Sequence, residues 1–168
     1  MKVILYMATT ANGLIAKGND DTSWISKEEW NSFNASVQTS GNIILGHRTY
    51  QIITKQPGPA ELEAVKVIVV SHQDFKTLSP NHFVAHSPKE ALELLRNFKT
   101  VIVAGGGVLN ASFLSENLVD EIYLDIEPMI MGKGIPLFNG LDFERKLEFI
   151  DSKKITDNEI QLHYKVVK

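Results

Sequence analysis

The sequence predicts a single α/β domain over residues 1–168, with a mostly parallel central sheet flanked by helices and an antiparallel hairpin at its C-terminal end. Continuous apolar runs rich in β-branched residues recur through the first two thirds of the chain, which is typical of strands covered on both faces. Helix-start signals separate these runs. The last third ends in two long strand-like segments joined by a short turn, which predicts an antiparallel pair.

Four apolar runs are the expected parallel strands of the sheet. They lie at residues 3–8, 42–46, 66–70 and 100–104. The first run follows a Met-Lys start but breaks at once into polar residues, so it predicts a buried strand and not a signal peptide. None of these runs has the length needed to cross a bilayer. We therefore expect a soluble, cytoplasmic protein with no membrane partner.

Helix-start signals lie between the expected strands. Ser26 and Glu29 have the spacing of a capping box. Pro88 directly after Ser87 is typical of the first turn of a helix. The apolar pattern that begins at Val108 predicts a further helix directly after the fourth strand.

The C-terminal third has a different pattern from the rest of the chain. Residues 119–127 alternate in part between apolar and polar, as an edge strand does. Residues 146–155 and 159–167 predict long strands joined by a turn at Asp157-Asn158. The segment Gln56-Pro57-Gly58-Pro59 is expected to be a surface loop, and no repeat or linker divides the chain.

Composition excludes several classes of function. Seventeen Lys plus Arg stand against 20 Asp plus Glu, a net charge of −3, which argues against a nucleic-acid partner. The chain has no cysteine, which excludes disulfides, thiolate zinc sites, iron–sulfur clusters and a cysteine nucleophile. His82 and His86 would be about 13 Å apart along a strand, too far for one metal ion. We expect no metal site.

The sharpest local feature is a strand that runs into three glycines. Gly105, Gly106 and Gly107 follow the apolar run and precede a helical pattern. Glycines at this position let the backbone approach a ligand closely, and the free N–H groups of a helix start attract phosphate. The segment is not a Rossmann fingerprint, because Asn110 stands where a further glycine is required. The alternative interpretation is a tight strand-to-helix turn without a ligand.

Two further strand ends carry groups that suit phosphate. Gly46 is followed by His47, Arg48 and Thr49, which supply a switchable cation, a fixed cation and a hydroxyl for a pyrophosphate or a 2′-phosphate. Ser71-His72 ends the next strand in the same manner. Open α/β sheets bind nucleotides at the carboxyl ends of their strands, so the three strand ends together predict a nucleotide site.

One segment is a candidate for acid–base chemistry. Glu29 lies close to Trp24, Trp30 and Phe33, and a carboxyl group on an aromatic pocket wall can have a raised pKa and deliver a proton. The alternative is that Glu29 has only a structural role, as the partner of Ser26 in the capping box at the start of the helix. The chain contains no nucleophile motif of a hydrolase and no P-loop, which favours chemistry carried by a cofactor.

The chain resembles the dihydrofolate reductase-like superfamily along nearly its whole length. Within it, the chain is most similar to stand-alone relatives of the reductase domain of the bifunctional riboflavin-biosynthesis deaminase/reductase. The matching segments occur in the family's order at residues 11–16, 24–26, 44–50, 69–71, 104–107, 118–121 and 128–138. The chain departs from these reductases at Asn12 and Ala104, where they usually carry acidic residues, so the substrate stays open.

The resemblance implies NADPH as the hydride donor and assigns its contacts. The implied cofactor-binding residues are Ala8, Ile15 and Ala16 beside the nicotinamide, Gly46, His47, Arg48 and Thr49 at the phosphates, Ser71 and His72 near the 2′-phosphate, and Gly105, Gly106, Gly107, Val108 and Leu109 at the pyrophosphate. Glu29 matches the single pocket carboxylate, which makes it the catalytic candidate. Trp24, Phe33 and Asp125 are the implied substrate-binding residues.

The implied function is that of an NADPH-dependent reductase of a pyrimidine- or pteridine-type heterocycle. The best single candidate is a 5-amino-6-(5-phosphoribosylamino)uracil reductase-like enzyme. The alternatives are a dihydrofolate reductase and a non-catalytic nucleotide-binding module of the same fold. Relatives of this type are commonly homodimers, and either the alternating edge at residues 122–126 or the C-terminal hairpin is the expected contact.

Overall fold

The computed structural model describes residues 1–55 and 60–168, so the loop expected at 56–59 lies outside the described residues. The strands are β1 (Lys2–Thr10), β2 (Leu14–Ala16), β3 (Asn42–Gly46), β4 (Lys66–Val70), β5 (His82–Ala85), β6 (Thr100–Val103), β7 (Glu121–Glu127), β8 (Ile135–Pro136), β9 (Leu147–Lys154) and β10 (Ile160–Val166). The helices are α1 (Lys27–Ser40), α2 (His47–Ile53), α3 (Ala60–Glu63), α4 (Pro88–Leu94) and α5 (Gly107–Ser115).

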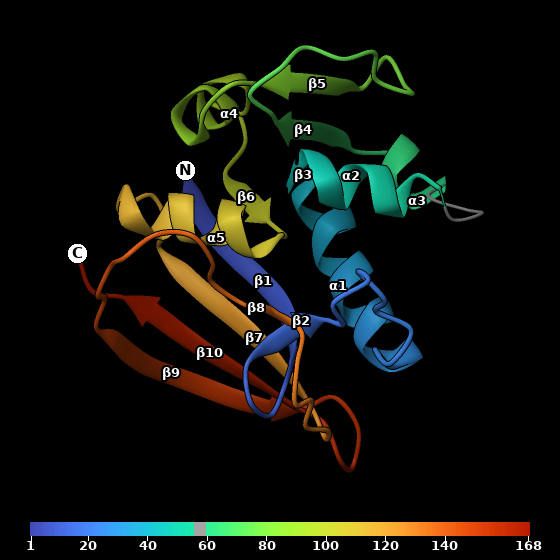
Figure 1. The fold of residues 1–168 in the computed structure, drawn as a ribbon. Coiled ribbons are helices and arrows are strands. Elements are labelled where there is room, and N and C mark those ends of the chain that lie inside the picture. Colours follow the sequence, from blue (N-terminus) through green and yellow to red (C-terminus); the bar gives the residue numbers. More distant parts are fainter. Residues whose placement is uncertain (56–59) are drawn as a thin grey trace.

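The central sheet has the strand order β5-β4-β3-β6-β1-β7-β10-β9 (Figure 1). The pairs from β5 through to β7 are parallel. Strand β10 is antiparallel to both β7 and β9, and the β9–β10 hairpin closes one edge. The expected fold class, a mostly parallel α/β sheet with an antiparallel C-terminal hairpin, is therefore confirmed.

Two apolar cores cover the two faces of the parallel strands. Adjacent residues of one strand enter different cores, because side chains alternate across a sheet. Ile44 packs with Phe113 of α5 and Leu92 of α4, whereas Ile43 packs with Val37 of α1. Because both faces are covered, the strands need continuous apolar runs, which is the pattern that made them recognisable in the sequence.

The expectation of an edge strand at residues 122–126 is wrong. Strand β7 lies between β1 and β10 and pairs with both. Its alternation has another cause: Ile122 is buried in the apolar core, while Asp125 is buried among polar groups. The free edge of the sheet at this end is β9, all of whose residues are exposed.

Short strands escaped the sequence analysis. Strands β2 and β8 form a separate two-stranded sheet, and β5 extends the main sheet beyond β4. Each has four residues or fewer, too short to show a period. No helix among the described residues combines the length and the apolar character that a membrane crossing requires.

The glycine segment after β6 joins the sheet to α5 and to the strand β8. Gly105 has φ +83°, a conformation that favours glycine, and its peptide bond to Gly106 is cis. Gly107 begins α5 and lies directly against the backbone of β8, so that a Cβ added there would overlap the carbonyl oxygen of Pro136. The N–H of Asn139 also donates to the carbonyl of Gly107 at 3.1 Å. Only a glycine lets these two segments approach so closely.

We expect Gly107→Ala to destabilise the fold. An alanine in a helix ordinarily stabilises by up to about 1 kcal/mol, but here the overlap with Pro136 forces a backbone shift that costs about 1–3 kcal/mol. Thermal unfolding would show a lower Tm than the wild type. Gly132→Ala is the matched control, because a Cβ at Gly132 meets no atom within 4 Å. Equal Tm values for the two variants would contradict the role given to Gly107.

Candidate functional site

A cavity of about 1180 Å³ opens at the carboxyl ends of the parallel strands. Its wall includes the ends of β1, β3, β4 and β6 together with the starts of α2 and α5. This is the edge at which open α/β sheets bind ligands. Pockets for one drug-sized ligand are roughly 300–1000 Å³, so the volume suits a large ligand or two ligands side by side.

The structure brings every predicted cofactor-binding residue to this one cavity. The lining includes Ala8, Ile15, Ala16, Gly46, His47, Arg48, Thr49, Ser71, His72, Gly105, Gly106, Gly107, Val108 and Leu109. The segments at 46–49 and 105–109 thus face a common space, as the sequence predicted. Contact with a cofactor itself stays a prediction.

The ends of β3 and β6 are tied by their backbones. The N–H of Gly46 donates to the carbonyl of Gly105 at 2.8 Å, and a Cβ on Gly106 would lie 3.3 Å from the hydroxyl of Thr49. Gly46 itself has φ −75°, a conformation that any residue adopts. A glycine is therefore useful here because it lets the two strand ends approach closely, and not because of its backbone conformation. Gly106 caps α5 without a side-chain hydrogen bond. The first-turn N–H groups of α5 are therefore left for an anionic ligand.

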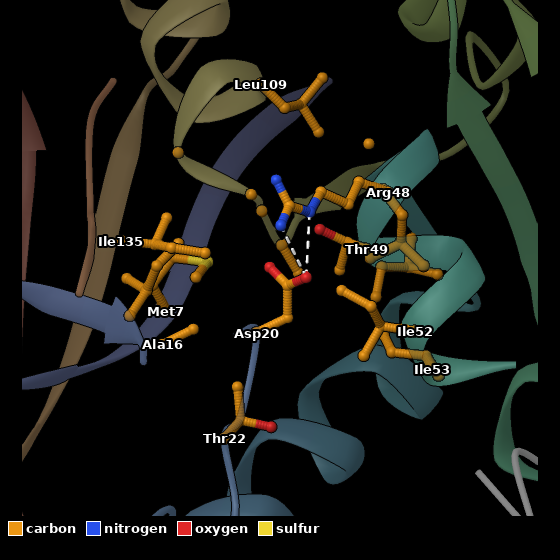
Figure 2. A pocket seen from close by; sticks show the side chains of 18 of the residues that line it. Met7, Ala16, Asp20, Thr22, Arg48, Thr49, Ile52, Ile53, Leu109 and Ile135 are labelled. Carbon is orange, nitrogen blue, oxygen red and sulfur yellow. Dashed lines mark hydrogen bonds and ion pairs between the residues drawn. The ribbon is translucent and has the colours of Figure 1, made fainter. Parts of the chain in front are cut away.

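An internal ion pair spans the cavity. Figure 2 shows Arg48 of α2 reaching across to Asp20 in the loop after β2. The Arg48 Nη2 and Nε atoms donate to the Oδ2 of Asp20 at 2.8 and 3.1 Å. Met7, Ala16 and Ile135 lie on the opposite side of the same view. Asp20 thus holds the guanidinium as a ligand anion would, a contact that the sequence analysis missed.

Glu29 is buried and lines the cavity. It lies in the first turn of α1 and is only 3% exposed. The Ser26 hydroxyl accepts from the N–H of Glu29 at 2.9 Å, so the serine half of the capping box is present. The N–H of Ser26, however, donates to Glu127 at 2.7 Å. In a complete capping box the Glu29 carboxyl group would accept this hydrogen bond from the Ser26 N–H. Because Glu127 accepts it instead, the Glu29 carboxyl group is left on the cavity wall.

A second carboxylate secures the same helix start. The Ser26 hydroxyl donates to Glu159, in the turn between β9 and β10, at 3.0 Å. Burial and the neighbouring Glu159 raise the pKa of Glu127 above its ordinary value. Ser26 is therefore fixed from two sides, and α1 enters the cavity wall in a defined position.

Asp125 lies behind the cavity wall in a buried polar network. It is 1% exposed and accepts hydrogen bonds from the Tyr6 hydroxyl at 2.8 Å and from the Gln161 amide at 2.7 Å. The Gln161 amide also donates to the Tyr6 oxygen at 2.8 Å, and the Tyr6 hydroxyl lies 3.0 Å from Ser32. Tyr6 and Gln161 were not predicted; strand register alone places Gln161 opposite Asp125.

This network shifts the protonation of Glu29. Burial, followed by the charges of Asp125 and Glu127, raises the pKa of Glu29 from 4.5 to about 8. Burial also raises the pKa of Asp125, but the hydrogen bonds from Gln161 and Tyr6 oppose that rise. At neutral pH the Glu29 carboxyl group therefore holds its proton. The cavity wall holds a neutral carboxylic acid that can donate a proton.

Of the predicted substrate-binding residues, only Phe33 lines the cavity. It packs beside Trp30, with ring centroids 5.7 Å apart, and edge-on against Tyr6 at 5.4 Å. The described cavity wall includes neither Asp125, which Tyr6 and Glu29 screen, nor Trp24. Trp24 lies between the lining residues Ser23 and Ile25, and its indole N–H is buried without a partner in the described structure. Contact of Trp24, Phe33 and Asp125 with a substrate itself stays a prediction.

Comparisons with known proteins agree with this fold. Residues 1–161 match the model of the RibD C-terminal domain family. The uncharacterized protein YwjB of Bacillus subtilis is 29% identical over 97% of both chains. A protein named for riboflavin biosynthesis, from Shewanella sp. PV-4, has a similar structure with a TM-score of 0.82 at 22% identity over 100% of both chains. A pyrimidine reductase-like protein from Corynebacterium diphtheriae has a TM-score of 0.78 at 16% identity, over 99% of this chain and 92% of its own.

The burial of Glu29 makes stability depend on pH. The unfolded chain releases the Glu29 proton near the ordinary pKa of 4.5, whereas the folded protein holds it to about pH 8. This contribution to folding is complete below pH 4.5 and is lost as the pH rises to 8. Glu29→Gln cannot ionise. We therefore expect the unfolding free energy of the wild type to fall, relative to Glu29→Gln, by about 2–4 kcal/mol between pH 5 and pH 8.

Urea unfolding at pH 5, 6.5 and 8 measures this difference. Glu28→Gln is the matched control, since Glu28 is the exposed neighbour in the same helical turn. A difference between wild type and Glu29→Gln that stays constant with pH would show that the Glu29 carboxyl group is not held protonated.

Proposed function

Because the chain belongs to the RibD C-terminal domain family, we propose that it is an NADPH-dependent reductase of a pyrimidine-type heterocycle. The first candidate substrate is 5-amino-6-(5-phosphoribosylamino)uracil or a close relative of it. One observation carries this proposal. A single cavity combines strand ends suited to phosphate groups with one buried carboxylic acid that is protonated at neutral pH.

The cavity fits a dinucleotide on its own features. The uncapped start of α5 and the Arg48 side chain would hold the two central phosphates. Small or aliphatic residues, Ala8, Ile15 and Ala16, offer a flat apolar wall to a nicotinamide ring. Bound there, NADPH would supply a hydride, the reactive group that the protein's side chains lack.

The residues of the chain would position the substrate and supply its proton. Phe33 and Trp30 present aromatic faces against which a planar heterocycle can stack. Glu29, in the same turn of α1, would donate the proton that accompanies the hydride. Asp125 does not reach the cavity; it acts on Glu29 by keeping the proton there. Glu29 is itself 3% exposed, so its carboxyl group has little contact with bulk water.

Two alternative functions, a dihydrofolate reductase and a non-catalytic binding module, are each favoured by one observation. A dihydrofolate reductase is favoured by the single protonated carboxyl group beside an aromatic residue. A non-catalytic binding module is favoured by the Asp20–Arg48 pair, which already satisfies the guanidinium at the cavity centre. Thermal-shift measurements with NADPH and, in turn, dihydrofolate, a dihydropterin or the phosphoribosylaminouracil distinguish these candidates by which compound raises the Tm further.

The direct test is a titration of the purified protein with NADPH, followed by fluorescence, together with turnover of the three heterocycles. We expect saturable NADPH binding below millimolar concentration. Glu29→Gln should bind NADPH as the wild type does but lose about 10²-fold or more in turnover, because it cannot donate the proton. Glu28→Gln serves as the matched control and should keep both. Absence of NADPH binding would reject the reductase, and binding without turnover of any heterocycle would favour the binding module.

We also propose that two copies associate through the β9–β10 hairpin. Strand β9 is the edge of the sheet at its antiparallel end, and its unpaired backbone groups can pair with another strand. Leu147, Phe149 and Ile150 on β9 are 42%, 60% and 43% exposed. An edge strand with exposed apolar side chains on both faces is a favourable surface for a symmetric contact.

Sedimentation at two protein concentrations tests this assembly. We expect a species of twice the 18.8 kDa chain mass for the wild type and a monomer for Phe149→Asp. Leu78→Asp is the control, since Leu78 is 71% exposed in the loop between β4 and β5, at the other end of the sheet. A wild type that stays monomeric, or a Phe149→Asp variant that stays dimeric, would contradict the proposed contact.

A further inference from the structure

Part of the cavity lining is apolar and comes from three helices. We call it the apolar wall, and its residues are Trp30 and Phe33 of α1, Ile52 and Ile53 of α2, and Leu62 of α3. Phe33, Ile53 and Leu62 pack in one apolar core, which joins the three helices. Trp30 is 40% exposed and the two isoleucines are half-buried, so the wall reaches solvent. Figure 2 shows both isoleucines on α2 at the cavity.

The apolar wall adjoins the proposed proton donor. Glu29 and Phe33 are four residues apart on α1, so their side chains lie on the same face of the helix. Trp30 directly follows Glu29, and its ring lies 5.7 Å from that of Phe33 between centroids. A heterocycle that takes a proton from Glu29 while stacking on these rings therefore directs its outer substituent along the apolar wall.

The charged groups of the cavity leave little positive charge for this substituent. The described lining includes two permanent cations, Lys27 and Arg48, and besides Glu29 two carboxylates, Asp20 and Asp21. Arg48 donates to Asp20 at 2.8 Å, so its charge is already balanced within the chain. Lys27 is exposed, at the first residue of α1. The lining histidines, at the ends of β3, β4 and β5, belong to the part of the cavity proposed for the cofactor.

A phosphate monoester on the substituent needs more than this. It carries nearly two negative charges at neutral pH, and proteins hold such groups with several charge-assisted hydrogen bonds. Lys27 alone is a weak partner, because water screens an exposed ion pair. Lys55, the next cation along the chain after α2, is not among the described lining residues. A phosphate placed against the apolar wall would lose hydration without gaining equivalent partners.

We propose that the substrate of this reductase is a planar heterocycle whose outer substituent is uncharged and apolar, and not a phosphate ester. This inference rests on the proposed function and narrows its substrate class to relatives of the phosphoribosyl compound that lack the phosphate. The ring stacks beside Glu29, and the substituent covers Trp30, Ile52 and Ile53. Binding then removes exposed apolar surface from water, which is favourable and requires no cation.

The first experiment compares two ligands that differ only in a phosphate, 5-amino-6-ribosylaminouracil and its 5′-phosphate. Their Kd values are measured with and without NADPH from the quenching of tryptophan fluorescence, since Trp30 belongs to the apolar wall. We expect the 5′-phosphate to bind no more tightly than the nucleoside. A subsite with two charge-assisted hydrogen bonds would instead lower the Kd about a hundredfold.

Lys27→Gln completes this comparison. We expect it to leave both Kd values unchanged, because neither ligand uses Lys27. A wild-type Kd for the 5′-phosphate tenfold or more below that of the nucleoside would overturn the proposal. Selective loss of 5′-phosphate binding in Lys27→Gln would also overturn it, since it would locate a phosphate subsite at Lys27.

The second experiment tests the apolar wall with two dihydropterins, one carrying a methyl group and one a benzyl group at the same ring position. We expect the benzyl compound to bind about tenfold more tightly, because its phenyl ring buries additional apolar area. Ile52→Asn should remove most of this gain and leave the Kd of the methyl compound nearly unchanged. Ile130→Asn is the matched control, since Ile130 is 76% exposed and is not among the described lining residues.

Equal affinity of the wild type for the two dihydropterins, or an undiminished benzyl gain in Ile52→Asn, would overturn the proposal. Circular dichroism of Ile52→Asn shows whether the variant is folded, and Ile53→Asn provides a second substitution in the same wall. The apolar wall is supported only if one folded variant loses the benzyl gain selectively.

The outcomes separate this inference from the reductase proposal. If NADPH binds and a heterocycle is reduced but the 5′-phosphate is preferred, the inference is overturned while the reductase stands. If NADPH does not bind but the preference for the uncharged, apolar ligands is found, the reductase fails and the assigned ligand class stands. If none of the four compounds binds, the inference is overturned whatever the result with NADPH.

Discussion

The candidate site depends on the backbone contact between the ends of β3 and β6. The N–H of Gly46 donates to the carbonyl of Gly105 at 2.8 Å, and no side chain separates the two segments. This contact brings the polar start of α2 and the uncapped start of α5 to one edge of the sheet. Gly107 then lets the β8 strand close over the same edge. Without these close approaches, the start of α2, which carries Arg48, and the start of α5, which carries free N–H groups, would not line the same cavity.

Local patterns in the sequence were sufficient for the sheet and for one end of the site. An apolar run predicts a buried strand because a strand that is covered on both faces needs apolar side chains on both. The parallel arrangement then places all carboxyl ends on one edge, so the groups following residues 46, 70 and 104 had to meet there. This is why the residues predicted at the phosphate groups, which follow these strand ends, line the cavity. The short strands gave no such signal, and β7 looked like an edge because its alternation comes from a buried polar position at Asp125.

The polar contacts of the site depend on long-range register, which no local pattern reports. Asp125 meets Gln161 because β7 and β10 pair in one register, and Tyr6 reaches both from a third strand. Asp20 meets Arg48 across 28 residues through a turn in which Asp20 has φ +66°. The capping-box spacing at Ser26 was read correctly for the serine, but the carboxylate partner of its N–H comes from β7 and not from Glu29. The spacing could not separate these two cases.

The chemistry proposed for the site depends in addition on one proton. Burial, together with the charges of Asp125 and Glu127, raises the pKa of Glu29 to about 8, so the carboxyl group on the cavity wall stays neutral at neutral pH. The backbone contacts that join the ends of β3 and β6 make no use of this proton. Loss of the Glu29 proton should therefore slow the chemical step without dismantling the cavity, and kcat should fall as the pH rises through about 8.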